Sequence, residues 1–212
     1  MKFINTLLAL LCLVVFAPGC GDVGHDDHDD HDHHGHDHDP NEVMTTIRLN
    51  FTAESGGEPF TATWADANND GNAMIDTITL TAGETYAVTV EVLNELEDPA
   101  ENVTEELQME LDEHQFFFYG EAISSPSSES TSAIVNQSYS DMDSVGFPVG
   151  LTNSFEAVEA GSGMLTIMLR HMPPVNGTAV KTGELAEMVK SGNTDSLPGS
   201  IDIQIDFPIT VQ

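Results

Sequence analysis

The fold class can be inferred from residues 201–211, which read IDIQIDFPITV. Apolar side chains occupy every second position, at Ile201, Ile203, Ile205, Phe207, Ile209 and Val211. This period of two is typical of a β-strand with one buried face. Because Pro208 has no N–H to donate to a neighbouring strand, it predicts a sheet edge or a β-bulge at that point.

The same alternation recurs in the preceding chain. Clear strands are predicted around residues 47–53, 60–64 and 86–92, and weaker ones around 76–80, 115–119, 133–139 and 147–154. Residues 164–169 are apolar on both faces, which indicates a central strand. One helix from Pro99 to about Glu113 and a shorter one over 184–190 are expected to interrupt the strands. The sequence therefore predicts an all-β fold, an antiparallel Ig-like β-sandwich with one inserted α-helix, over residues 43–212.

The charge balance restricts the partners. The 212 residues include 36 Asp and Glu against 5 Lys and Arg, which gives a formal net charge of −31. A polyanion repels nucleic acid, so a nucleic-acid-binding function is excluded and cations are the expected partners. The chain has no GxSxG, HExxH or phosphate-binding glycine motif, so we expect no enzymatic activity.

The first residues are typical of an export signal. Lys2 precedes an apolar run, residues 7–16 (LLALLCLVVF), that is about 15 Å long as a helix and too short to span a membrane. Residues 17–20 (APGC) resemble the bacterial lipobox, whose cysteine is lipidated and becomes the mature N-terminus, although Ala17 stands where that motif usually has Leu. We therefore predict a signal peptide over residues 1–19 and lipidation at Cys20, with the simpler alternative of a plain secretory signal.

A polar segment follows the predicted lipidation site. Residues 22–39 read DVGHDDHDDHDHHGHDHD and contain seven of the nine histidines of the chain. Val23 is the only apolar side chain of residues 22–39, so residues 20–42 are predicted to form a disordered tail. The alternative is a low-complexity acidic spacer that holds a domain away from the membrane.

The composition of this tail favours binding of divalent transition metals. Neutral imidazole is a ligand for zinc, copper and nickel, and carboxylates add anionic oxygens, so weakly selective binding with zinc as the main candidate is expected. Because protons compete for imidazole, binding should weaken as the pH falls through the range where histidine titrates. The predicted ligands are His25, His28, His31, His33, His34, His36, His38, Asp26, Asp29, Asp32 and Asp37.

Two weaker candidate sites lie in the predicted domain. Asp66, Asn68 and Asp70 match the first half of an EF-hand calcium loop, although a hairpin turn explains the same residue types. Glu106, Glu110 and His114 are four residues apart and would share one face of the predicted helix, where they form either a metal site or a solvated face. His171 could approach that face, but its position cannot be deduced from the sequence.

Short motifs from residue 46 onward carry a family resemblance. They are TIRLNFT at 46–52, TATW at 61–64, DTITL at 76–80, TYAVTV at 85–90, LNE at 93–95, PAE at 99–101, DEHQF at 112–116, VGLT at 149–152 and LRH at 169–171. With these motifs the chain resembles an uncharacterised lipoprotein family of Bacteroidetes, often labelled a type 1 periplasmic-binding fold. That label implies an α/β sheet, whereas the alternation in this sequence predicts a β-sandwich. The resemblance implies no activity or catalytic residues.

Two functions from different classes are consistent with the sequence. The first is an exported outer-membrane lipoprotein, on the periplasmic or cell-surface face, that buffers zinc or delivers it to an outer-membrane transporter. In this hypothesis the lipid anchor holds the chain to the membrane and the tail, which resembles His-rich zinc-binding segments, collects the ion. The second is a surface adhesion or structural module whose acidic tail is only a spacer.

Overall fold

The computed structural model describes residues 43–212. The predicted signal peptide (1–19), Cys20 and the His/Asp-rich tail (20–42) lie outside the described residues, so the predictions made for them are not tested by the structure.

The C-terminal stretch forms β12 (Ser200–Val211), as its alternation predicts. It belongs to a four-stranded sheet of order β4-β12-β11-β6, with β4 (Ile78–Leu80), β11 (Gly161–His171) and β6 (His114–Tyr119). Because β4 pairs with β12 only at residues 209–211, Pro208 lies where that side of β12 has no strand partner among the described residues. β12 is thus not an edge strand, although Pro208 lies where one of its sides is locally unpaired, and β11 is a central strand.

The second sheet has eight strands in the order β3-β2-β1-β5-β10-β9-β7-β8. They are β1 (Thr46–Ala53), β2 (Phe60–Ala65), β3 (Met74–Ile75), β5 (Thr85–Leu93), β7 (Ile123–Ser125), β8 (Ser128–Glu129), β9 (Val135–Tyr139) and β10 (Thr152–Ala157). All pairings in both sheets are antiparallel except two short parallel ones, β4 with β12 and β7 with β9.

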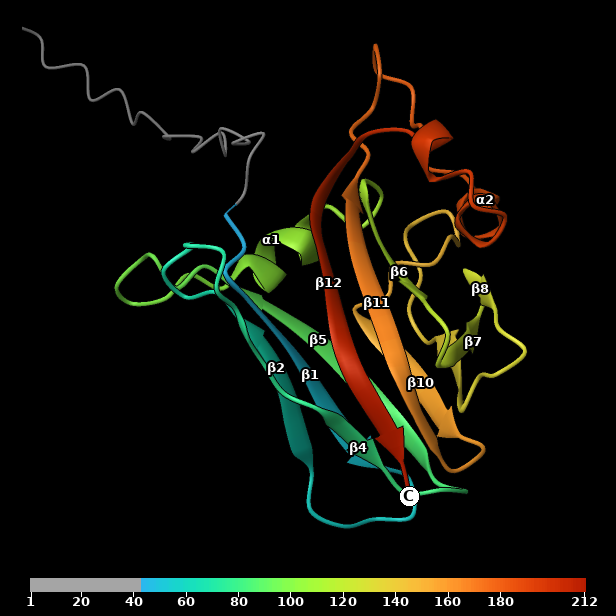
Figure 1. Ribbon diagram of the computed structural model, residues 1–212. Coiled ribbons are helices and arrows are strands. Elements are labelled where there is room, and N and C mark those ends of the chain that lie inside the picture. The colour runs from blue at the N-terminus through green and yellow to red at the C-terminus, as the bar shows by residue number, and fades with distance from the viewer. Residues whose placement is uncertain (1–42) are drawn as a thin grey trace, which may run out of the picture. The chain divides into compact units, whose positions relative to one another are not determined.

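The two sheets pack face to face, and the core fills the space between them (Figure 1). Phe155 lies between Phe51 and Phe118, with ring centroids 5.9 and 5.8 Å away in edge-to-face geometry. All three rings are fully buried, and a buried side chain of this size contributes roughly 1.5–3 kcal/mol to stability. The predicted β-sandwich is confirmed.

The inserted helix is shorter than predicted. α1 covers Val103–Met109 only, instead of Pro99 to about Glu113. At its start, Glu101 exchanges two backbone hydrogen bonds with Asn94 and is therefore held extended. At its end, residue 114 already pairs with β11, so the chain must leave the helix before it. The helix pattern cannot show either constraint, because one comes from the bridge to Asn94, before the helix, and the other from β11, far along the chain.

The outer face of the four-stranded sheet is covered by the segment between β11 and β12. This segment contains α2 (Leu185–Lys190), as predicted, and the short 3-10 helix η1 (Thr194–Ser196). A second apolar cluster lies beneath it and includes Phe117, Met168, Met172, Leu185, Val189 and Leu197. Neither helix of the described residues is long and apolar enough to span a lipid bilayer.

A β-bulge interrupts the alternation of β12. Leu169 pairs with Ile203 but Arg170 pairs with Ile201, so Asp202 is the extra residue. A bulge changes the face on which the following side chains lie. Consequently Ile201 is half exposed instead of buried, and the Asp202 side chain is mostly buried with 13% exposure, contrary to the simple period of two.

Candidate functional site

A pair of stacked histidines lies at one end of the sandwich interior. The register of β6 and β11 places His114 opposite His171, two residues beyond the core pair Phe116 and Leu169 and therefore on the same inward face. The two imidazole rings stack with centroids 4.4 Å apart and planes inclined by 11°. The His114 side chain is 1% exposed and that of His171 is 17% exposed.

Three carboxylates surround this pair. For His114, Nδ1 lies 3.9 Å from Oε2 of Glu110 and 3.2 Å from its backbone oxygen, while Nε2 lies 3.9 Å from Oδ2 of Asp202. For His171, Nε2 lies 3.6 Å from Oε2 of Glu113. One ligand atom from each of Glu110, His114 and His171 can be chosen so that all three lie within 4.8 Å of one another. Imidazole nitrogens and carboxylate oxygens at this spacing are suitable ligands for a zinc-like ion.

Burial changes the proton affinity of two groups in the cluster in opposite directions. Desolvation, followed by repulsion from His171, lowers the pKa of His114 to about 4, so its ring is neutral at pH 7. Desolvation raises the pKa of Asp202 to about 6, although the charges of His171 and Arg170 oppose the change. Arg170 itself donates hydrogen bonds to the carbonyls of Leu197, Pro198 and Gly199.

These shifts predict an unusual pH dependence for the substitution Asp202→Asn. Between pH 4 and 6.5 the unfolded chain binds more protons at His114, so that group makes stability rise with pH. Over the same range the folded chain binds more protons at Asp202, so that group makes stability fall. Removing the Asp202 carboxyl should therefore raise the free energy of unfolding, relative to the unsubstituted protein, by about 2 kcal/mol more at pH 6.5 than at pH 4.

Urea unfolding at both pH values, with a chelator present, measures this difference. Asp206→Asn is the matched control because Asp206 is an exposed carboxylate of the same strand. If the free energies of unfolding of Asp202→Asn and the unsubstituted protein changed in parallel with pH, folding would not raise the pKa of Asp202.

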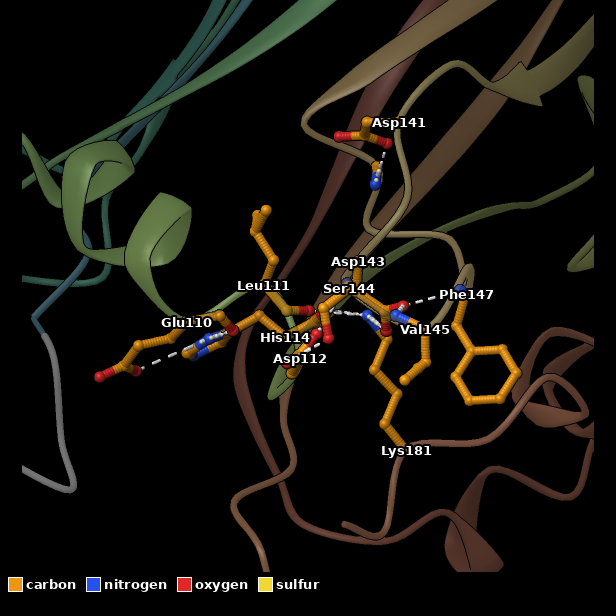
Figure 2. A network of polar contacts seen from close by, with 11 residues as sticks. Glu110, Leu111, Asp112, His114, Asp141, Asp143, Ser144, Val145, Phe147 and Lys181 are labelled. Carbon is orange, nitrogen blue, oxygen red and sulfur yellow. Dashed lines mark hydrogen bonds and ion pairs between the residues drawn. The ribbon is translucent and has the colours of Figure 1, made fainter.

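A buried ion pair lies beside His114 (Figure 2). Nζ of Lys181 is 3.0 Å from Oδ2 of Asp143, and both side chains are 1% exposed. The same ammonium donates hydrogen bonds to the carbonyls of Leu111 and His114, at 2.8 and 2.9 Å. Lys181 thus joins the segment that follows β11 to the start of β6. No sequence pattern indicates this pair, because a single lysine in a polar loop is usually solvated.

Neighbouring aspartates order the loop that carries Asp143. Oδ1 of Asp143 accepts the N–H groups of Val145 and Phe147. Asp112 accepts both the N–H and the hydroxyl of Ser144, and Asp141 accepts the N–H groups of residues 150 and 152. These contacts fix the backbone of the loop over residues 141–152 (Figure 2).

The predicted cluster of Glu106, Glu110 and His114 needs correction. These residues do not share a helix face, because α1 ends at Met109 and His114 belongs to β6. The structure keeps Glu110 and His114 together, leaves Glu106 out of the group and adds His171. The sequence also missed Asp202, whose inward position depends on the bulge.

The predicted calcium loop forms a turn closed by its own side chains. Oδ1 and Oδ2 of Asp66 accept the N–H groups of Asp70 and Gly71, and Nδ2 of Asn68 donates to Asp70. The backbone is left-handed at Asn69 and Gly71. Turn chemistry therefore accounts for these residue types, and calcium binding at Asp66, Asn68 and Asp70 stays a prediction.

No family model, curated protein or solved structure matches this chain.

Proposed function

We propose that this protein is an exported, membrane-anchored lipoprotein that binds divalent transition metal ions, with zinc as the main candidate. The lipid anchor is at Cys20, and ions are taken up by the histidines and aspartates of residues 22–39 and by a site in the folded domain. Buffering zinc, or passing it to an outer-membrane transporter, is the expected role.

One observation of the folded domain carries the proposal. Glu110, His114 and His171 offer ligand atoms within 4.8 Å of one another in a mostly buried setting. His114 has a lowered pKa, so its ring is neutral at pH 7 and protons do not compete strongly for its lone pair. The tail offers the same type of ligand at seven positions.

The two parts would bind metal differently. A tail that is disordered, as its composition predicts, can wrap several ions with little selectivity because its geometry follows the metal. The folded cluster can hold one ion and would discriminate by geometry. An ion bound to the cluster also stabilises the fold, because the cluster exists only in the folded state. A disordered tail has the same metal affinity before and after unfolding, so an ion bound there adds no stability.

Deleting residues 22–39 tests the role of the tail in cells. We expect less cell-bound zinc and slower growth when zinc is limiting, because several ligand sets are lost at once. The matched control replaces the seven tail histidines with asparagine, which keeps the length and the aspartates. If both variants lose zinc, the metal role holds. If neither variant changes growth or bound zinc, the tail is a spacer and the adhesion or structural alternative replaces the metal role.

A further inference from the structure

We propose that Asp202, rather than Glu110, supplies the carboxylate ligand of the metal site in the folded domain, bound together with Nε2 of His114. The inference rests on the proposed function and names the ligands of its folded site. It follows from the tautomer of His114, from the gap between His114 and Asp202, and from the bulge in β12.

The hydrogen bond at Nδ1 identifies the tautomer of His114. Nδ1 lies 3.2 Å from the backbone oxygen of Glu110, and a carbonyl oxygen can only accept. Nδ1 therefore carries the proton in the neutral ring, and the lone pair is on Nε2. Histidines that bind metals commonly donate their other ring N–H to a carbonyl or carboxylate, which fixes the orientation of the ring. Nε2 is thus the atom of His114 available to an ion.

The carboxylate that faces this lone pair belongs to Asp202. Oδ2 of Asp202 lies 3.9 Å from Nε2 of His114, and it is a buried oxygen that accepts no hydrogen bond among the described residues. The lone pair of Nε2 and that of Oδ2 therefore face each other with no hydrogen-bond donor between them. This arrangement is unfavourable unless a cation fills the gap. Zinc lies about 2.0–2.2 Å from imidazole and carboxylate ligands, so at a tetrahedral angle the two ligand atoms would be roughly 3.4 Å apart, and the gap would have to close by about 0.5 Å.

The backbone supports this role of Asp202. In a regular strand the residue between Ile201 and Ile203 lies on the face opposite to them, away from the histidines. The bulge opposite Leu169 and Arg170 instead places the Asp202 carboxylate beside His114. Arg170 directs the hydrogen bonds of its guanidinium to the carbonyls of residues 197–199 and not to the Asp202 carboxylate. Bulges that redirect a side chain are frequent next to functional sites.

Glu110 and His171 then have different roles. Glu110 is a positioning residue, because its carbonyl accepts from Nδ1 while its carboxylate lies on the Nδ1 side of the ring. His171 is the third ligand. Because its ring is nearly parallel to that of His114, the two lone pairs converge only after one ring turns, and His171 is the more exposed of the two.

The test uses the full chain with its seven tail histidines replaced by asparagine, so that only the folded domain presents histidine ligands. Zinc affinity is measured by calorimetry at pH 7, and the visible spectrum of bound Co²⁺ reports the coordination geometry. Three variants are compared in this background: Asp202→Asn, Glu110→Gln and the control Asp206→Asn. All three are near-isosteric, and Asp206 is an exposed residue of the same strand.

We expect one zinc ion per chain in the background protein and a loss of affinity of roughly 100-fold in Asp202→Asn, with a changed Co²⁺ spectrum. Glu110→Gln, which keeps the carbonyl, should weaken binding no more than about 10-fold, and Asp206→Asn should leave it unchanged. A larger loss in Glu110→Gln than in Asp202→Asn would overturn the inference while keeping the folded site. Unchanged zinc affinity in Asp202→Asn would also overturn it. If the background protein binds no zinc, the folded site of the proposed function itself fails.

Discussion

Replacing Lys181 with methionine is expected to lower the free energy of unfolding by about 3–5 kcal/mol. Methionine keeps the unbranched stem but removes the ammonium. The Asp143 carboxylate would then stay buried without its ion partner, and the carbonyls of Leu111 and His114 would each lose a donor. Burial lowers the pKa of Lys181, while Asp143 is the main group that opposes this change, so the ammonium depends on its partner. Urea unfolding at pH 7 measures the effect.

The matched control is Lys190→Met. Lys190 pairs with Glu129 and Glu187, whose side chains are 82% and 71% exposed, so its removal should change stability by less than about 1 kcal/mol. The double variant Lys181→Met, Asp143→Asn should be less destabilised than the sum of the two single variants, because the uncompensated charge is gone. Equal small effects for both lysines would contradict the buried-pair account.

Gly199→Ala is expected to cost more than about 3 kcal/mol of stability or to prevent folding. Gly199 precedes β12 and has a left-handed backbone, with φ of +75°. A Cβ atom there would lie 1.9 Å from the carbonyl oxygen of His171. The backbone at residue 199 would have to move away from that of His171. This would break the pairing of His171 with Ser200 and move the carbonyls that hold Arg170. Thermal and urea unfolding both report the loss.

Gly192→Ala is the control that separates the cost of a left-handed backbone from the cost of the steric clash. Gly192 has a similar φ of +79°, but a Cβ atom there meets nothing within 4 Å. Its substitution should cost about 1–2 kcal/mol, the price of a left-handed alanine alone. If both glycine variants lost the same stability, the close approach of Gly199 to His171 would have no energetic role.

The strands could be predicted from the sequence wherever one face is buried along a regular strand. In β1, β5 and the C-terminal half of β12 the alternation matches the burial of the side chains. The prediction failed at the two ends of α1 and at the bulge in β12. There the conformation is set by pairing partners that the local pattern does not reveal, Asn94 for Glu101, His171 for His114 and Leu169 with Arg170 for Asp202.

The candidate site was predictable only in part, for the same reason. Glu110 and His114 were found through a helical spacing that the structure does not contain, and they remain together because a tight turn follows α1. His171 joins them through the pairing of β6 with β11, and Asp202 through the bulge. Lys181 and Asp143 are 38 residues apart and lie in two different loops, so no local sequence pattern predicts their ion pair.

The most direct test of metal binding is a calorimetric titration of the full chain, with its tail intact, using zinc at pH 7. More than one ion should bind per chain, because the tail and the folded cluster both contribute ligands, and the heat should diminish as the pH is lowered toward 5. A titration with no heat of zinc binding at pH 7 would contradict the account and leave a β-sandwich without a metal function.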